Sequence, residues 1–157
     1  NGCMKGDTMA LPAVTTQRIE AVLKDEELEY GVDDDNEVFA SFVNANFFYR
    51  IVEDIELLFI YGYWRAETAD SDLVARLREF IKDKNSDIYL PKLTMVFLDD
   101  GLLRVGYEYS APVGGGLTDE QLHNTIIAVF GTTFSVLEEL EQAFPKLVTW
   151  DVEEGED

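Results

Sequence analysis

The sequence predicts an α+β fold in a single domain, in which an antiparallel sheet is packed by helices in the order α-β-β-β-α-β-β-α. Three observations support this fold class. The 157 residues are enough for one domain of ordinary size and hardly enough for two. Apolar and polar residues alternate over residues 103–109, which is typical of a half-buried strand. Apolar residues recur at helical spacing over residues 122–144.

The first half of the chain predicts one helix and three strands. The helix is expected to begin at Thr15 or Thr16, because threonine is a good N-cap and apolar residues follow at helical spacing. The next segment, residues 25–37, holds eight carboxylates in thirteen positions, and Gly31 together with its aspartates indicates a turn. Aromatic and β-branched residues then predict strands over residues 38–43, 47–52 and 57–64.

The second half predicts a helix, a hairpin and a long final helix. The helix is expected over residues 71–84, capped by Asp70 or Ser71 and ending near Asn85. The hairpin strands, residues 93–98 and 103–110, flank Asp99-Asp100-Gly101, whose glycine can take the positive φ of a tight turn. The final helix is expected to begin with a capping box of Thr118 and Gln121 and to stop at Pro145.

The domain is expected to span residues 15–150. Residues 1–14 are predicted to be a disordered leader, within which Met4 and Met9 are candidates for the native start. Residues 151–157 are predicted to be an acidic tail. No linker or internal repeat divides the sequence between these ends.

The charge excludes several classes of partner. Thirty-two acidic residues stand against 12 lysines and arginines, so the formal net charge is −20. Nucleic acids and anionic membrane surfaces are bound mainly through basic residues, and this chain would repel both. The longest uncharged stretch, residues 121–137, is too polar and slightly too short to span a bilayer. We therefore expect a cytoplasmic protein with no nucleic-acid or membrane partner.

The inventory of reactive residues argues against an enzyme. The single cysteine and the single histidine, His123, exclude an internal disulfide and a histidine-rich zinc site. An EF-hand loop that began at Asp33 would have Val38 in place of its glycine and Asn44 in place of its final glutamate. The glycines of residues 114–116 lack the lysine of a phosphate-binding loop. The sequence thus predicts no catalytic residue, no cofactor and no metal site.

The aromatic residues carry the one functional signal. Half of those in residues 47–49 and 61–64 should face the core, and the other half should face outward as a contact surface. We expect a basic or amphipathic polypeptide partner, steered by acids and held by exposed rings. Two alternatives stay open: a small-ligand sensor or enzyme with an acidic pocket, and an acidic mimic of nucleic acid. The candidate contact residues are Phe48, Tyr61, Tyr63 and Trp64, together with Asp33, Asp34 and Asp35.

A homodimer is also predicted. Residues 121–137 carry no charge on any face of the final helix, although a helix at a protein surface normally shows a polar, charged side. Such a helix needs cover on two sides, from the sheet and from a second subunit.

The order of elements and several short motifs resemble the YbjN domain family of bacteria over residues 15–145. The resemblance implies a fold like that of type III secretion chaperones and a non-enzymatic role in the regulation of sensory transduction, without catalytic residues. Lys84 departs from the pattern, because an aromatic residue is often expected at this position, just before Asn85. The residues that carry the resemblance are Arg18-Ile19-Glu20-Ala21, Tyr63-Trp64-Arg65, Asn85 with Pro91-Lys92, Asp99-Asp100-Gly101, Arg104-Val105 with Glu108, and Leu117-Thr118-Asp119-Glu120-Gln121-Leu122.

Overall fold

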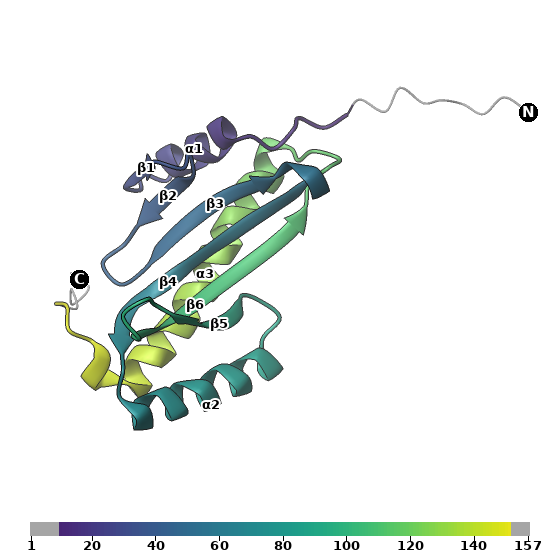
Figure 1. The fold of residues 1–157 in the computed structure, drawn as a ribbon. Coiled ribbons are helices and arrows are strands. Elements are labelled where there is room, and N and C mark those ends of the chain that lie inside the picture. The colour runs from purple at the N-terminus through teal and green to yellow at the C-terminus, as the bar shows by residue number, and fades with distance from the viewer. Residues whose placement is uncertain (1–9, 152–157) are drawn as a thin grey trace, which may run out of the picture.

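A computed structural model describes residues 10–151 and shows one antiparallel sheet packed by three helices (Figure 1). The sheet has six strands in the order β1-β2-β3-β4-β6-β5. The predicted α+β class and order of elements are confirmed, with one additional short strand, β1, inside the acidic segment. The elements are α1 (Thr16–Asp25), β1 (Tyr30–Val32), β2 (Val38–Ser41), β3 (Asn46–Val52), β4 (Leu57–Thr68), α2 (Ser71–Asp87), β5 (Lys92–Phe97), β6 (Leu103–Pro112) and α3 (Asp119–Ala143), with short 3-10 turns at Glu53–Ile55 and Pro145–Leu147.

The helices begin where their capping residues place them. The side chain of Thr15 accepts a hydrogen bond from the backbone N–H of Arg18, and the side chain of Asp70 accepts one from that of Leu73. Thr118 and Gln121 form the complete capping box at the start of α3. Each cap satisfies backbone N–H groups that the first helical turn leaves without partners. The predicted helix starts are therefore confirmed.

The second helix is longer than predicted because Asn85 does not end it. α2 continues to Asp87, and the Asn85 side chain reaches across to β5. Its Nδ2 donates to the carbonyl oxygen of Leu93 and its Oδ1 accepts from the N–H of Leu93, both at 2.9 Å. Asn85 thus joins the end of α2 to the start of β5, as a backbone strand partner would.

The end of the predicted leader is ordered and packed. Val14 is buried, and the N–H of Leu117 donates to the carbonyl oxygen of Pro12 at 3.0 Å. Residues 10–14 therefore belong to the domain, which corrects the expected boundary at residue 15. The expectations for residues 1–9 and for the tail after Asp151 lie outside the described residues.

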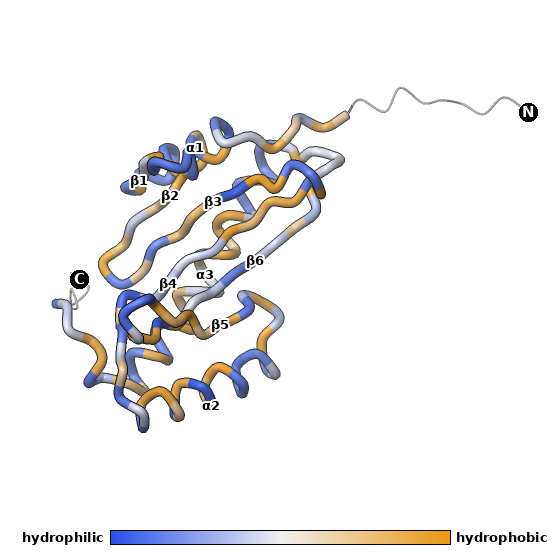
Figure 2. The backbone as a smooth tube through the Cα atoms, in the orientation of Figure 1, coloured by the Kyte–Doolittle hydropathy of each residue, from blue (hydrophilic) through white to orange (hydrophobic). Residues whose placement is uncertain are grey.

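The core lies between one face of the sheet and the helices. Figure 1 shows α3 crossing behind the sheet, α1 beside β1 and β2, and α2 beside β5. Along α2, apolar and polar positions alternate with the helical turn (Figure 2), and Leu77 and Ile81 are its buried residues. The predicted alternation in β6 is confirmed, because Leu103, Val105 and Tyr107 are buried on the helix side. None of the described helices is long and apolar enough to cross a membrane.

Candidate functional site

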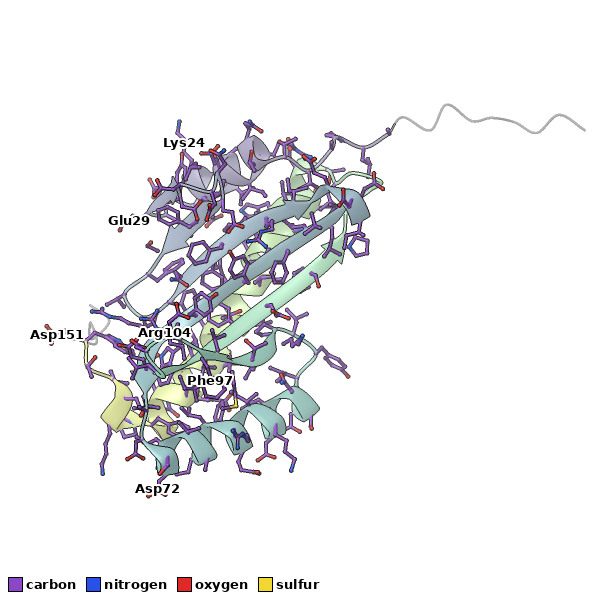
Figure 3. All side chains as sticks on the ribbon, in the orientation of Figure 1. Lys24, Glu29, Asp72, Phe97, Arg104 and Asp151 are labelled. Atoms are coloured by element: carbon purple, nitrogen blue, oxygen red, sulfur yellow. The ribbon has the colours of Figure 1, made fainter. Side chains whose placement is uncertain are left out.

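The face of the sheet opposite α3 carries five aromatic side chains. Successive residues of a strand point to opposite faces, so the neighbours of the buried residues on β2, β3 and β4 point away from the core. None of the described helices covers this face, which is turned toward the viewer in Figure 1. Figure 3 shows rings along these strands. We call the five half-buried residues the aromatic stripe: Phe39, Phe48, Phe59, Tyr61 and Tyr63.

The rings of the stripe contact one another across three strands. Strand register places Phe39 opposite Phe48, and Phe48 opposite Tyr61. The Phe48 and Tyr61 rings stack with centroids 5.2 Å apart, and Phe59 stacks on Tyr61 at 5.0 Å. Tyr63 meets Tyr61 edge-on at 6.3 Å. Such pairs hold the rings in fixed positions and leave part of each ring open to solvent.

Gly31 makes room for the first ring of the stripe. It pairs with Phe39 across β1 and β2, and a Cβ at this position would lie 2.9 Å from the Cζ atom of Phe39. Any larger residue would displace the ring. The glycine that predicted a turn in the acidic segment is thus part of a strand, where it allows Phe39 to lie over the edge of the sheet.

A buried carboxylate closes one end of the stripe. Glu37 is 9% exposed, and its Oε2 accepts a hydrogen bond from the hydroxyl of Tyr61 at 2.5 Å. Its Oε1 accepts from Nε of Arg50, whose guanidinium carbon lies 5.5 Å from the centroid of the Tyr61 ring. Burial, followed by the hydrogen bond to Glu37, raises the pKa of Tyr61, so its hydroxyl stays protonated and donates. The hydrogen bond to Glu37 raises the pKa of Arg50 as well.

The three aspartates predicted to steer a partner lie in the β1–β2 turn and are separated from Glu37 by Asn36 alone. Asp33 Oδ1 accepts hydrogen bonds from the N–H groups of Asp35 and Glu37, both at 2.9 Å, so its carboxylate closes the turn. Asp34 and Asp35 are exposed. We call residues 33–37 the acidic turn. Two free carboxylates therefore sit beside the Glu37 end of the aromatic stripe.

Trp64 does not belong to this surface, which corrects its prediction as a contact residue. It is fully buried at 0% exposure and points to the helix side, where its ring meets that of Trp150 edge-on at 6.1 Å. The reason is the alternation of the strand, because Tyr63 faces outward and the next residue must face inward. Of the predicted aromatic residues, Phe48, Tyr61 and Tyr63 lie together on the open face.

Four residues of the site were not predicted. Phe59 shares the outward face of β4 with Tyr61 and Tyr63, and this spacing of two was visible in the sequence. Phe39 alternates with buried Val38 in the same way. Glu37 and Arg50 carried no local signal, because their pairing depends on the register of different strands.

This surface combines apolar rings with a small number of charged groups. Its polar groups are carboxylates, a guanidinium group and phenols, and the described residues contain no group of three or more His, Cys, Asp or Glu placed to hold a metal ion. Stacked rings offer apolar area, and the carboxylates offer negative charge at one end. Such a surface suits a ligand that is both apolar and cationic.

Comparisons with known proteins show a solved structure of similar fold and a matching protein family. No curated protein has a matching sequence. The crystal structure of YbjN from E. coli, described as a "putative transcription regulator", is similar with a TM-score of 0.70 at 14% sequence identity, and the similarity covers 86% of this chain and 96% of that one. The family model of YbjN, described as a "putative bacterial sensory transduction regulator", matches residues 15–146. The chain therefore belongs to the YbjN family.

Proposed function

We propose that the chain is a non-enzymatic regulator that binds a basic or amphipathic polypeptide segment on the open face of its sheet. The observation that carries the proposal is the continuity of the aromatic stripe with the acidic turn through the Tyr61–Glu37 hydrogen bond. The regulatory description of the family supports the regulatory part. The net charge of −20 opposes any role that requires contact with nucleic-acid phosphates.

The two parts of the surface have different tasks in binding. Exposed Asp34 and Asp35 attract a cationic segment and raise its association rate, an effect that salt screens. The rings of Phe48, Phe59 and Tyr63 provide contacts that exclude water and hold the segment after it arrives. Added salt should therefore weaken binding without abolishing it.

A library of random peptides selected on the full chain tests the proposal. The selected peptides should be enriched in Lys or Arg combined with large apolar residues. A Phe59→Ala/Tyr63→Ala variant should bind them about tenfold or more weakly, as expected when anchoring rings are removed. Tyr89→Ala is the matched control, because Tyr89 is fully exposed but lies in the loop before β5, outside the stripe.

Two results would overturn the proposal. One is a set of selected peptides without basic character. The other is unchanged affinity for the Phe59→Ala/Tyr63→Ala variant, provided that circular dichroism shows it to be folded. Both variants keep Tyr61 and Glu37, the two partners of the hydrogen bond that joins the stripe to the acidic turn.

We further propose that the chain forms a homodimer through α3. Over residues 121–137 of α3 the exposed residues are uncharged, among them Asn124, Ile127, Ala128, Gly131 and Ser135. In a chain with a charge of −20, an uncharged face is where a second copy meets the least repulsion. Light scattering at micromolar concentration should give twice the mass of 17.8 kDa, and a clean monomer mass would refute the dimer.

A further inference from the structure

An apolar cavity lies on the helix side of the sheet, away from the aromatic stripe. It has a volume of about 620 Å³ and is formed by α3, the β2–β3 turn and the segment that follows α3. Cavities of roughly 300–1,000 Å³ are typical of small-molecule sites. Its apolar lining consists of Phe134, Pro145, Val148 and Trp150.

Two carboxylates stand at the rim of this cavity. Glu138 and Glu141 are three residues apart on α3, so they share one side of the helix. Nδ2 of Asn44 donates to Oε2 of Glu141 at 2.9 Å, which holds this carboxylate near the β2–β3 turn. No lysine or arginine is among the described residues that line the cavity. The rim is therefore negative above an apolar floor.

The aromatic floor of the cavity is held in a fixed position. Trp150 is 8% exposed and meets the ring of Trp64 edge-on, so its position is set by the core. The guanidinium carbon of Arg65 lies 5.5 Å from the centroid of the Trp150 ring. One face of the Trp150 ring is therefore already in contact with a cation, and the ring offers a ligand its remaining apolar area.

Two other occupants fit the cavity poorly. The chain after Asp151 carries only acids among its ionisable residues, and the carboxylates at the rim would repel it. A polypeptide bound to the aromatic stripe lies on the opposite face of the sheet. The charge and the volume favour a small, separate molecule.

We propose that this cavity binds a small amphipathic cation, in which an ammonium or guanidinium group is joined to an aromatic or branched apolar body. The cationic group pairs with Glu138 and Glu141, and the apolar body packs on Phe134 and Trp150. The inference is independent of the polypeptide-binding proposal, because the two surfaces share no residue.

Titration of the full chain with phenethylamine at physiological ionic strength tests the assignment by NMR. The signal of the Trp150 indole N–H and the backbone signals of Phe134, Glu138 and Glu141 should shift and saturate together. Hydrocinnamate, which has the same ring and a carboxylate, should leave these signals unchanged. Phenethyl alcohol, which is neutral, should bind more weakly than the amine.

A Glu138→Gln/Glu141→Gln variant should bind the amine up to about tenfold more weakly, because two partly exposed ion pairs contribute about that factor. A glutamine still accepts the hydrogen bond of Asn44, so the site keeps its shape. The control, Glu79→Gln/Asp83→Asn on α2, removes the same charge from two exposed residues outside the cavity and should bind as the parent chain does.

Three results would overturn the assignment. The first is equal binding of the amine and of hydrocinnamate. The second is an equal effect of the two double variants, which would mean a general attraction to an acidic protein. The third is a dimer whose dissociation at low concentration shifts the same signals, which would place a second copy of the chain in the cavity.

Discussion

Arg18 and Asp119, which lie 101 residues apart in the chain, are joined by two hydrogen bonds from one guanidinium group to one carboxylate oxygen, at 3.3 Å from Nε and 2.8 Å from Nη2. The same guanidinium donates to the carbonyl oxygens of Pro12, Ala13 and Leu117 at 2.8–2.9 Å. A single side chain on α1 thus fastens the residues before α1 to the start of α3.

The first prediction concerns this guanidinium group. Arg18→Ala should lower the free energy of unfolding by about 2–4 kcal/mol, because it removes the guanidinium donor of the Ala13 and Leu117 carbonyl groups together with the link to Pro12 and Asp119. Asp119→Asn should cost less than about 1 kcal/mol, since the Asp119 side chain is 95% exposed. Urea unfolding measures both. Arg78→Ala, at an exposed position on α2, is the control, and an equal loss there would contradict the role of Arg18.

The features that could be predicted from the sequence depend on residues that are close together in the chain. The capping box joins Thr118 and Gln121, three residues apart, and the hairpin turn needs only Gly101, whose φ is 84°. The contact between Glu37 and Tyr61 spans 24 residues and depends on the register of three strands. In the sequence, Glu37 is one of eight acids among the thirteen residues 25–37, and nothing local distinguishes the one that becomes buried.

Tyr63 and Trp64 likewise show that the local sequence does not determine which face of the sheet a residue occupies. Alternation requires that neighbours in a strand face opposite sides, but it does not say which of them faces the core. Register decides this, because Tyr63 lies opposite Gly106, on the open face, and the next residue turns toward α3. The sequence therefore predicted that half of these aromatic residues face outward, but the structure was needed to show which ones do.

The second prediction concerns Thr133, which is fully buried on α3. Among the described residues, its hydroxyl has no hydrogen-bond partner. A buried hydroxyl without a partner costs free energy, so Thr133→Val should raise the free energy of unfolding by about 1 kcal/mol. Thr132→Val is the control, because that hydroxyl donates to the carbonyl oxygen of Ala128 at 2.8 Å. A loss of stability in Thr133→Val would show that the hydroxyl is bonded.

The third prediction concerns pH and the contact between α1 and α3. Nε2 of His123 lies 2.6 Å from Oε1 of Glu26, and this hydrogen bond raises the pKa of His123. A group whose pKa is higher in the folded state contributes its full stabilisation at pH values below its unfolded pKa, which is about 6.5 for histidine. This contribution is lost as the pH rises through the folded pKa.

His123→Gln should therefore lose more stability, relative to the parent chain, at mildly acidic pH than at alkaline pH. Chemical unfolding at a series of pH values measures the difference. Glu26→Gln should remove the same pH-dependent part, because it deletes the partner. A difference between the parent chain and His123→Gln that is constant with pH would contradict the assignment.

The fourth prediction concerns the response of the whole domain to salt. The described part of the chain contains six ion pairs. The sequence has 32 acidic residues and only 12 lysines and arginines, so there are too few cations for most carboxylates to have one each. Salt reduces the range of this repulsion from about 30 Å at about 0.01 M to about 10 Å at about 0.1 M. The melting temperature should therefore rise with NaCl, by about 2–4 °C for each kcal/mol of repulsion that is relieved.

An Asp34→Asn/Asp35→Asn variant should melt higher than the parent chain at low salt and respond less to salt, because the acidic turn then contributes less repulsion. A melting temperature that stays flat or falls between low salt and about 0.3 M NaCl would show that repulsion among the carboxylates does not limit the stability of the fold.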